Sequence, residues 1–220
     1  MTTGQFNLVV LGKQGAGKGT QSQRLCEKYS LAHISTGDIL RAAVQAGTTL
    51  GLEVKSVLDS GGLVSDDLVN KLVEDRFKED DAKRGGVLDG FPRNIGQAEA
   101  LDTILGANGL KLCLYIELPN ELVMQRLSSR RVCQECGTTY KDSDPAAISG
   151  TCEVCGGDVV QRSDDKPEAI QKRLDIFERD TVPLLSFYEK KGILETVNGN
   201  QPVDVVADAI NAVLTARGLV

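Results

Sequence analysis

LVVLGKQGAGKGT, residues 8–20, is the stretch of sequence that decides the fold of this chain. A short apolar run ends at Gly12, and a helical pattern runs from Lys18 to Tyr29. Gly12, Gly17 and Lys18 have the G-x-x-x-x-G-K spacing, which lets the backbone turn tightly and aim several N–H groups inward at phosphates. The following helix adds its positive N-terminal end, and Lys18 adds a point charge for the β- and γ-phosphates of a nucleotide. The stretch therefore predicts a strand, a phosphate-binding loop and a helix.

One position departs from the strict pattern, which has Ser or Thr directly after the lysine. Gly19 stands there, and the hydroxyl is on Thr20. A generic glycine-rich turn is the alternative interpretation, but it accounts poorly for the combination of spacing, lysine and strand–helix context. By itself the loop predicts binding of nucleotide phosphates and no particular reaction.

Outward from this loop, strand patterns alternate with helical patterns. Strands are predicted at residues 6–11, 86–89, 110–118 and 193–197. Helices are predicted at residues 18–29, 36–46, 50–59, 66–78, 95–105, 119–131, 167–190 and 202–215. We expect Pro119 to lie in the first turn of its helix, where its ring is tolerated. This alternation predicts an α/β fold with a parallel sheet and helices on both faces.

Two stretches interrupt the alternation and are predicted to be excursions from the sheet. Residues 36–64 are helical without an intervening strand and are punctuated by glycines. Residues 129–165 hold four cysteines and show little helical periodicity. We expect both to be insertions into one core, not independent repeats.

The composition restricts the class of protein. With 220 residues, 41% of them hydrophobic and 25% charged, the chain can bury one substantial core and carry small insertions. Aromatic residues make up 4%, Trp is absent and the formal net charge is −6, which argues against binding of nucleic acid. No segment has the roughly 20 consecutive apolar residues that span a bilayer, and the N-terminal MTTGQFNLVVLG lacks the basic region of a signal peptide. We therefore expect a soluble cytoplasmic protein without a membrane partner, with reduced or metal-bound cysteines.

Arginines dominate the polar motifs, and no activated nucleophile accompanies them. The single histidine, His33, is interpreted as structural, and no arrangement typical of an activated serine is found. Arginines recur instead beside Gly, Pro and Asp in predicted loops and helix starts, at positions 41, 93, 130, 162 and 173. A guanidinium binds phosphate oxygens through two parallel bonds, and a phosphate acceptor is already anionic and needs no general base. The pattern favours phosphoryl transfer to a phosphate over transfer to a hydroxyl.

Asp89 ends the short predicted strand GVLD and precedes Gly-Phe-Pro. Ligands of an open parallel sheet gather at the carboxyl ends of its strands. A carboxylate at that place can hold the hydration shell of Mg²⁺, which keeps several waters. A carboxylate that caps a turn is the alternative interpretation.

Four cysteines in two pairs predict a metal site. Cys133-x-x-Cys136 and Cys152-x-x-Cys155 are separated by fifteen residues, which is a spacing typical of a tetrahedral structural Zn²⁺ site. Four thiolates leave no open coordination position, so the metal is expected to be structural. It would supply folding energy that the few apolar residues around it cannot.

Two alternatives to zinc remain open at this point. Iron accepts the same ligands, and two disulfides could join the same cysteines, although a cytoplasmic setting disfavours them. The other two cysteines, Cys26 in a predicted helix and Cys113 in a predicted strand, are expected to be buried apolar thiols.

With these motifs in this order, the sequence resembles the adenylate kinases along essentially its whole length. The strings that carry the resemblance are GKQGAGKGT (12–20), HISTGDILR (33–41), GGLVSDDLV (61–69), DGFPRNIGQA (89–98), RRVC (130–133), RSDD (162–165) and KRL (172–174). The combination is very specific. It implies a core with the phosphate loop at residues 1–34, 65–128 and 166–220, an AMP-binding insert at 35–64 and a zinc-bearing lid at 129–165.

The resemblance also implies roles for individual residues. An ATP site would comprise Gly15, Ala16, Gly17, Lys18, Gly19, Thr20, Arg126, Arg130, Thr139, Tyr140 and Gln201. An AMP site would comprise Thr36, Arg41, Gly62, Leu63, Val64, Gly90, Phe91, Pro92, Arg93, Gln97, Arg162 and Arg173. Within these sets Gln97 would read the adenine edge, and Asp164 and Asp165 would position lid arginines. The catalytic cations would be Lys18, Arg93, Arg130, Arg162 and Arg173.

The implied reaction is the reversible transfer of a phosphoryl group from MgATP to AMP, giving two ADP, by a monomeric enzyme of adenine nucleotide homeostasis. Three departures from the family pattern, at Lys13-Gln14, Asn94 and Gln201, do not threaten this assignment. A kinase for UMP or CMP, or one that uses GTP, is the nearest alternative. A non-catalytic nucleotide-gated module that binds nucleic acid through the cysteine segment is an alternative from another class.

Overall fold

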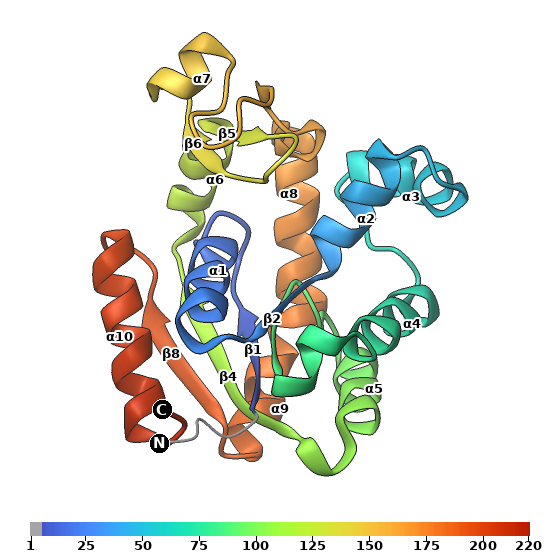
Figure 1. Cartoon of the computed structure of the whole chain (residues 1–220), viewed down its shortest axis with the longest axis vertical. Helices are drawn as coiled ribbons and strands as arrows, with labels where there is room; N and C mark the ends of the chain where they lie inside the picture. The colour runs from blue at the N-terminus through green and yellow to red at the C-terminus, as the bar shows by residue number, and fades with distance from the viewer. Residues whose placement is uncertain (1–5) are drawn as a thin grey trace.

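The computed structural model describes residues 6–220. The first five residues of the predicted core segment 1–34, which also begin the N-terminal stretch MTTGQFNLVVLG, lie outside it. A five-stranded sheet forms the centre (Figure 1). Its order is β2-β3-β1-β4-β8, and every adjacent pair is parallel. The strands are β1 (Asn7–Leu11), β2 (Ala32–Ser35), β3 (Gly86–Asp89), β4 (Leu110–Glu117) and β8 (Leu194–Asn198). The predicted parallel α/β fold is confirmed.

Helices cover both faces of this sheet, and its strands are therefore buried on both sides. In β1, Leu8 and Val10 pack into one apolar cluster, while Val9 and Leu11 pack into the other, as the two-residue period of a strand requires. The first cluster is completed by α1 (Lys18–Tyr29), α6 (Asn120–Ser128), α8 (Pro167–Ile176) and α10 (Val203–Ala216). The second is completed by α4 (Asp66–Phe77), α5 (Ile95–Leu105) and α9 (Pro183–Lys190). Short 3₁₀ turns lie at Asp80–Arg84 and Gly106–Asn108.

The segment after β2 leaves the sheet as two packed helices, α2 (Thr36–Gln45) and α3 (Thr49–Asp59). Their contact depends on Gly51, because a Cβ at that position would lie 2.0 Å from the carbonyl oxygen of Ala43. In Figure 1 this pair projects beyond the end of the sheet at which the phosphate loop lies.

The cysteine segment forms a second, small sheet. Its strands are β5 (Arg130–Cys133), β6 (Thr139–Lys141) and β7 (Val159–Val160), in the order β6-β5-β7, and both pairs are antiparallel. A short helix, α7 (Pro145–Ser149), and a 3₁₀ turn, η3 (Ser163–Asp165), complete it. Only three buried apolar side chains, two of them cysteines, form its core cluster.

Most predicted boundaries agree with the structure to within one residue, but two expectations were wrong. The helix predicted at 119–131 is α6, which ends at Ser128 because the following residues pair as β5. Pro119 is the residue that caps this helix and does not lie in its first turn. Residues 167–190 are helical, as predicted, but they do not form one regular α-helix. They contain a π-helical segment, η4 (Phe177–Thr181).

The π-helical segment has a local cause in Pro183. Its ring would clash with the carbonyl four residues earlier, and it has no N–H to donate. The preceding amide widens the turn, with the N–H of Val182 donating to the carbonyl of Phe177 at 2.9 Å. Within residues 6–220 no helix is long and apolar enough to cross a membrane.

Candidate functional site

The phosphate loop joins β1 to α1 at the carboxyl edge of the sheet. Gly12, Gly15 and Gly17 have φ angles of 151°, 76° and 95°, in the region that favours glycine. Gly12 is also fixed by space, since a Cβ there would lie 2.6 Å from the carbonyl oxygen of Ile116. Gly17 precedes α1 without a side-chain cap, so the first N–H groups of the helix have no side-chain acceptor in the cap position. The loop therefore offers backbone donors at a helix N-terminus, as an anion requires.

Lys18 folds back over this loop. Its ammonium donates to the carbonyl oxygens of Gly12 and Lys13 at 2.8 and 2.9 Å. Burial lowers the pKa of Lys18 to about 8, against the attraction of Asp89, which raises it. Three arginines that face the same centre, Arg173, Arg93 and Arg130, lower the pKa further. Lys18 therefore lies among positive charges, and an anionic ligand would reduce the repulsion between them.

Asp89 ends β3 next to the phosphate loop. Its register partners are Val10 in β1 and Ser35 in β2. A Cβ at Gly19 would come within 3.4 Å of the Asp89 carboxylate, so the glycine leaves the space beside it open. Among residues 6–220 no side chain or backbone group donates a hydrogen bond to this carboxylate. An oxygen ligand next to a phosphate loop, with free lone pairs and adjacent space, fits a hydrated Mg²⁺ ion.

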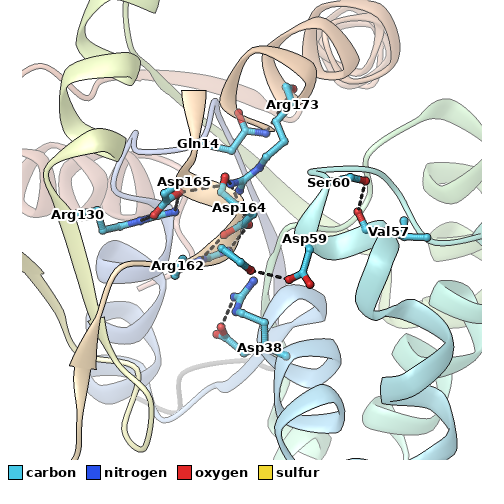
Figure 2. Close-up of polar contacts among 12 residues, drawn as sticks. Gln14, Asp38, Val57, Asp59, Ser60, Arg130, Arg162, Asp164, Asp165 and Arg173 are labelled. Atoms are coloured by element: carbon cyan, nitrogen blue, oxygen red, sulfur yellow. Dashed lines mark hydrogen bonds and ion pairs between the residues drawn. The ribbon is translucent and has the colours of Figure 1, made fainter. Parts of the chain in front are cut away.

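A cluster of arginines and aspartates lies between the cysteine segment and α8 (Figure 2). Arg130 donates to the buried Asp165 through Nε and Nη2, at 2.7 and 2.6 Å. Arg162 donates to Asp164 through the same two atoms, at 2.8 and 2.6 Å. Arg173 from α8 lies 2.9 Å from Asp164 and 3.6 Å from Asp165. Two carboxylates thus hold three guanidinium groups in fixed positions.

The charges of this cluster are strongly coupled. Burial would raise the pKa of Asp164, but Arg173 and Arg162 outweigh it and hold that pKa well below its usual range. Burial lowers the pKa of Arg173, and Asp164 opposes this effect, while Arg162, Arg130 and Arg93 add to it. A guanidinium remains charged at neutral pH. The cluster therefore concentrates positive charge at a site where phosphate oxygens would reduce the repulsion.

A cleft opens beside this cluster, between α2, α3 and the loops after β3. Of the predicted AMP-site residues, those that line it are Thr36, Arg41, Gly62, Leu63, Val64, Arg93, Gln97 and Arg173. The other lining residues are Gly37, Leu40, Leu58, Gly61, Val69 and Asp164. The cleft combines apolar walls with cations, as a nucleotide monophosphate would need.

Four predicted AMP-site residues lie around the cleft without lining it. The carbonyl of Gly90 accepts from Thr36 Oγ1 at 3.0 Å and from Arg93 Nε at 2.7 Å. Phe91 is fully buried in the core and joins Pro92 through a cis peptide bond. Arg162 reaches the cleft through Asp164, the carboxylate that it binds.

Gln97 is a buried polar residue of the cleft, with 2% of its surface exposed. Its Nε2 donates to Asp66 Oδ1 at 2.6 Å, and its Oε1 accepts from the backbone N–H of Arg93 at 2.8 Å. Asn94 Nδ2 donates to both oxygens of Asp66 at 3.1 and 3.0 Å. Sequence analysis did not identify Asp66, which is in the first turn of α4 and reads as one of two ordinary acidic residues at a helix start.

The predicted ATP-site residues outside the phosphate loop divide into two groups. Arg126 bridges the loop, donating to the carbonyls of Gly15 at 3.2 Å and Gly199 at 3.1 Å. Within the described part of the chain, no hydrogen bond or ion pair joins Thr139, Tyr140 or Gln201 to the loop. Tyr140 instead turns its hydroxyl to Cys152 Sγ at 3.2 Å.

Cys133, Cys136, Cys152 and Cys155 come together as a group of four candidate metal ligands. Their Sγ atoms all lie within 4.8 Å of one another. The pair Cys133–Cys155 is 3.4 Å apart and the pair Cys136–Cys152 is 3.6 Å apart, far beyond a disulfide bond of about 2.05 Å. Zn–S bonds of about 2.3 Å in a tetrahedron place sulfur atoms about 3.8 Å apart. The four residues therefore fit a single metal ion.

The two remaining thiols differ from these four. Cys113 is fully buried in β4, as expected, whereas Cys26 on α1 is only partly buried. Burial raises the pKa of Cys113 and raises that of Cys26 to about 12. Both are poor nucleophiles and poor metal ligands at neutral pH.

Comparison with known proteins gives consistent matches over the chain. A family model described as Adenylate kinase matches residues 10–193. A protein named adenylate kinase from Thermodesulfovibrio yellowstonii is 49% identical over 96% of this chain and 100% of its own length. Proteins of the same name from Agathobacter rectalis and Methanosarcina mazei are 47% and 44% identical over 95% of this chain, and over 99% and 98% of their own lengths.

Proposed function

This chain belongs to the adenylate kinase family and is an enzyme that interconverts ATP plus AMP with two ADP, and we propose that it does so by direct in-line transfer across the arginine–aspartate cluster. One observation carries this proposal. The phosphate loop and the cleft lined by Arg93 and Arg173 are joined directly, since Gln14 of the loop donates to the carbonyl of Arg173 at 3.4 Å, and both arginines act on the charge of Lys18. A donor held by the loop and an acceptor held in the cleft would meet there phosphate to phosphate.

Each side of the centre has its own donors. On the ATP side, backbone N–H groups of residues 15–20 would hold the phosphates, with Lys18 bridging the donor and the transferred group. Arg126 and Arg130 would face the same phosphates from the lid boundary. Thr139 and Tyr140 are proposed to reach ATP only when the lid closes, because Tyr140 now contacts Cys152. Gln201 is in the core and would contact ATP through its backbone carbonyl.

On the AMP side, Arg41 and Arg93 would bind the phosphate, and Gln97 would read the adenine edge. Backbone groups of residues 62–64 and 90–93 would complete the site beside Thr36. Arg162 and Arg173 would clamp the phosphates of both nucleotides. The guanidinium of Arg93 is well placed for this role because its Nε is already fixed by Gly90, which leaves its two Nη groups for the ligand.

The chemistry needs no acid, base or nucleophile from the protein. The acceptor oxygen belongs to a phosphate and is already anionic, so attack on the γ-phosphorus requires only alignment and neutralisation of charge. The arginines and Lys18 would spread the charge of the transferring group. Asp89 would hold the water shell of Mg²⁺, and the ion would help to neutralise the charge of the ATP phosphates.

The two insertions are proposed to act as moving parts. Residues 35–64 would form the AMP-binding insert and residues 129–165 the lid, both closing on a core of residues 1–34, 65–128 and 166–220. Closure would exclude water, which otherwise would accept the phosphoryl group of ATP. Zn²⁺ bound by the four lid cysteines would be structural, since the lid has few buried apolar residues.

The remaining properties are proposed on general grounds. A net charge of −6 fits a cytoplasmic protein that binds neither nucleic acid nor membranes, with ATP, AMP and ADP as its partners. A monomer is proposed because each copy of the chain contains every residue of the site described above.

The experiment that tests the proposed site measures ADP formation from MgATP with AMP, CMP, UMP or GMP as acceptor, beside a zinc assay. We expect rapid ADP formation with AMP alone and about one zinc per chain. Turnover with a pyrimidine nucleotide would keep the fold and mechanism but would overturn the role of Gln97. Binding of ATP without turnover on any acceptor would contradict the assigned catalytic centre and favour a non-catalytic nucleotide-binding module.

A further inference from the structure

The side-chain amide of Gln97 is held at both ends by groups whose hydrogen-bonding character is unambiguous. Its Oε1 accepts from the backbone N–H of Arg93, and a peptide N–H can only donate. Its Nε2 donates to the carboxylate of Asp66, and a carboxylate can only accept. The two contacts together allow one orientation of the amide, because a flipped amide would place donor against donor and acceptor against acceptor.

Asp66 is itself held in place from a second direction. Asn94 donates to both of its carboxylate oxygens, and the Oδ1 of the same Asn94 accepts from the backbone N–H of Gln97 at 2.8 Å. The three side chains therefore form a closed network between the first turns of α4 and α5. Gln97 lines the cleft, whereas Asp66 lies behind it and does not.

This fixed orientation has a consequence for the base in the cleft. After the contacts with Arg93 and Asp66, the Gln97 amide has one free N–H and one free oxygen lone pair. Adenine offers the complementary pair on its Watson–Crick edge, with N1 accepting and the 6-amino group donating. A 6-oxopurine has the opposite polarity, because its O6 accepts and its N1–H donates. A 6-oxopurine could be read only by the flipped amide.

We propose that Asp66 is a positioning residue that fixes the Gln97 amide and thereby makes the acceptor site select a 6-aminopurine over a 6-oxopurine monophosphate. The proposal rests on the proposed role of Gln97 as the reader of the base. It adds that Asp66 determines which end of the Gln97 amide donates to the base and which end accepts from it. Asp66 need not touch the nucleotide to exert this effect, since it acts through a single hydrogen bond of 2.6 Å.

The test compares AMP with inosine monophosphate, which differs from AMP only in its 6-oxo group and N1–H. Asp66→Asn keeps the shape of the side chain, but its amide can either accept or donate, so it no longer opposes the flipped Gln97 amide, and only the N–H of Arg93 still favours the original orientation. We expect the ratio of kcat/KM for inosine monophosphate to that for AMP to rise by about tenfold, the order of one hydrogen bond to a charged group. Asp66→Ala, which removes the acceptor altogether, should change the ratio in the same direction.

Asp67→Asn is the matched control. Asp67 is the adjacent acidic residue in the same first turn of α4, so its loss removes the same charge from the same helix terminus. No hydrogen bond joins it to Gln97 among the described residues. The ratio should stay at its original value in this variant, with a similar small change in thermal stability.

A Gln97→Leu variant separates failure of this inference from failure of the proposed role of Gln97. A changed ratio in Gln97→Leu, with an unchanged ratio in both Asp66 variants, would overturn the positioning role and leave Gln97 as the reader. Equal losses of kcat/KM for both nucleotides in the Asp66 variants would show that Asp66 only supports the structure, which also overturns the inference. An unchanged ratio in Gln97→Leu would contradict the reading role on which the inference rests.

Discussion

Arg130 and Asp165 form a two-bonded ion pair that joins the two ends of the cysteine segment. Arg130 begins β5, and Asp165 ends the 3₁₀ turn before α8, so the pair closes a loop of more than thirty residues at its base (Figure 2). The Asp165 side chain is fully buried, and that of Arg130 is 16% exposed. The same pair therefore fixes a proposed catalytic cation and the base of the proposed lid.

Asp165→Asn should destabilise the protein markedly, because it leaves the buried charge of Arg130 without its partner. Breaking a buried ion pair from one side typically costs about 3–5 kcal/mol in free energy of unfolding. Urea unfolding at neutral pH measures this loss. Asp142→Asn, which removes an exposed carboxylate from the same segment, is the control and should change the free energy by less than about 0.5 kcal/mol. A loss in Asp165→Asn no larger than that of the control would mean that the pair does not stabilise the fold.

Arg93→Lys should reduce kcat by about 10²-fold while leaving the fold intact. Lysine keeps the charge but loses the planar fork, of which one N–H is fixed by Gly90 and the others face the cleft. Steady-state kinetics with varied AMP measure the effect. Arg84→Lys, an exposed change of the same kind, should behave as the wild type. Full activity in Arg93→Lys would show that Arg93 contributes charge without specific geometry.

Thr181→Val should raise the KM for AMP several-fold with a modest loss of stability. Thr181 lies in the π-helical segment and donates from Oγ1 to the carbonyl of Arg93 at 2.8 Å, a bond worth roughly 1 kcal/mol. Thr103→Val removes a comparable bond to Glu99 on the exposed side of α5 and serves as the control. Equal kinetic constants in the two variants would mean that the π-helical segment does not position Arg93.

The pH dependence of ATP use should report the charge of Lys18. In the free enzyme its pKa is about 8, so kcat/KM for MgATP should fall as the pH rises above 8, as the charged form is lost. Bound phosphates favour the charged form, and kcat at saturating ATP should therefore persist to higher pH. A kcat/KM that stays constant up to pH 10 would contradict the charge assigned to Lys18.

The lowered pKa of Lys18 also makes the stability of the fold depend on pH, and stability should rise with pH where activity falls. The pKa of Lys18 falls from an ordinary value of 10.5 to about 8 on folding, so the unfolded chain binds more protons between these values. The contribution of Lys18 to the free energy of unfolding is therefore unfavourable at neutral pH and becomes less so as the pH rises from 8 to 10.5. Burial of the charged Lys18 thus lowers the stability of the fold while it places a cation at the functional site.

Removal of the metal should loosen the lid and expose its thiols. Chelation should release about one zinc per chain, lower the melting temperature and make the four lid cysteines reactive toward a thiol reagent. Cys113 should stay unreactive in the folded protein because it is buried, and Cys26 should react slowly because its pKa is raised to about 12. The opposite result is release of no metal together with four reactive thiols before chelation, which would exclude a structural metal site.

Sequence patterns predicted those parts of the molecule that depend on local chemistry. Glycine spacing identified the loop before Lys18, and cysteine spacing identified ligands that the fold brings together from residues 133–155. Strand and helix positions followed from apolar periodicity, with most boundaries in agreement. These features are readable because each depends on residues that are neighbours or lie a fixed number of positions apart.

The missed features depend on contacts between distant segments. β2 has the sequence AHIS, four residues without a clear period, and is a strand because it pairs with β3. The role of Asp66 appears only when α4 meets α5, since it bonds Gln97 thirty-one positions away. The π-helical segment could have been suspected from Pro183, which a regular helix does not tolerate in its interior.

The most direct test of direct transfer follows both nucleotides in one reaction. ATP labelled in its γ-phosphate and AMP labelled in its adenine are mixed with the enzyme and Mg²⁺, and the products are separated. The account predicts that the phosphate label appears in the same ADP molecules that carry the adenine label, with little label in inorganic phosphate. The contradicting result is release of the label mainly as inorganic phosphate, at a rate that does not depend on AMP. It would mean that water, and not the acceptor phosphate, lies next to the γ-phosphate of ATP in the closed active centre.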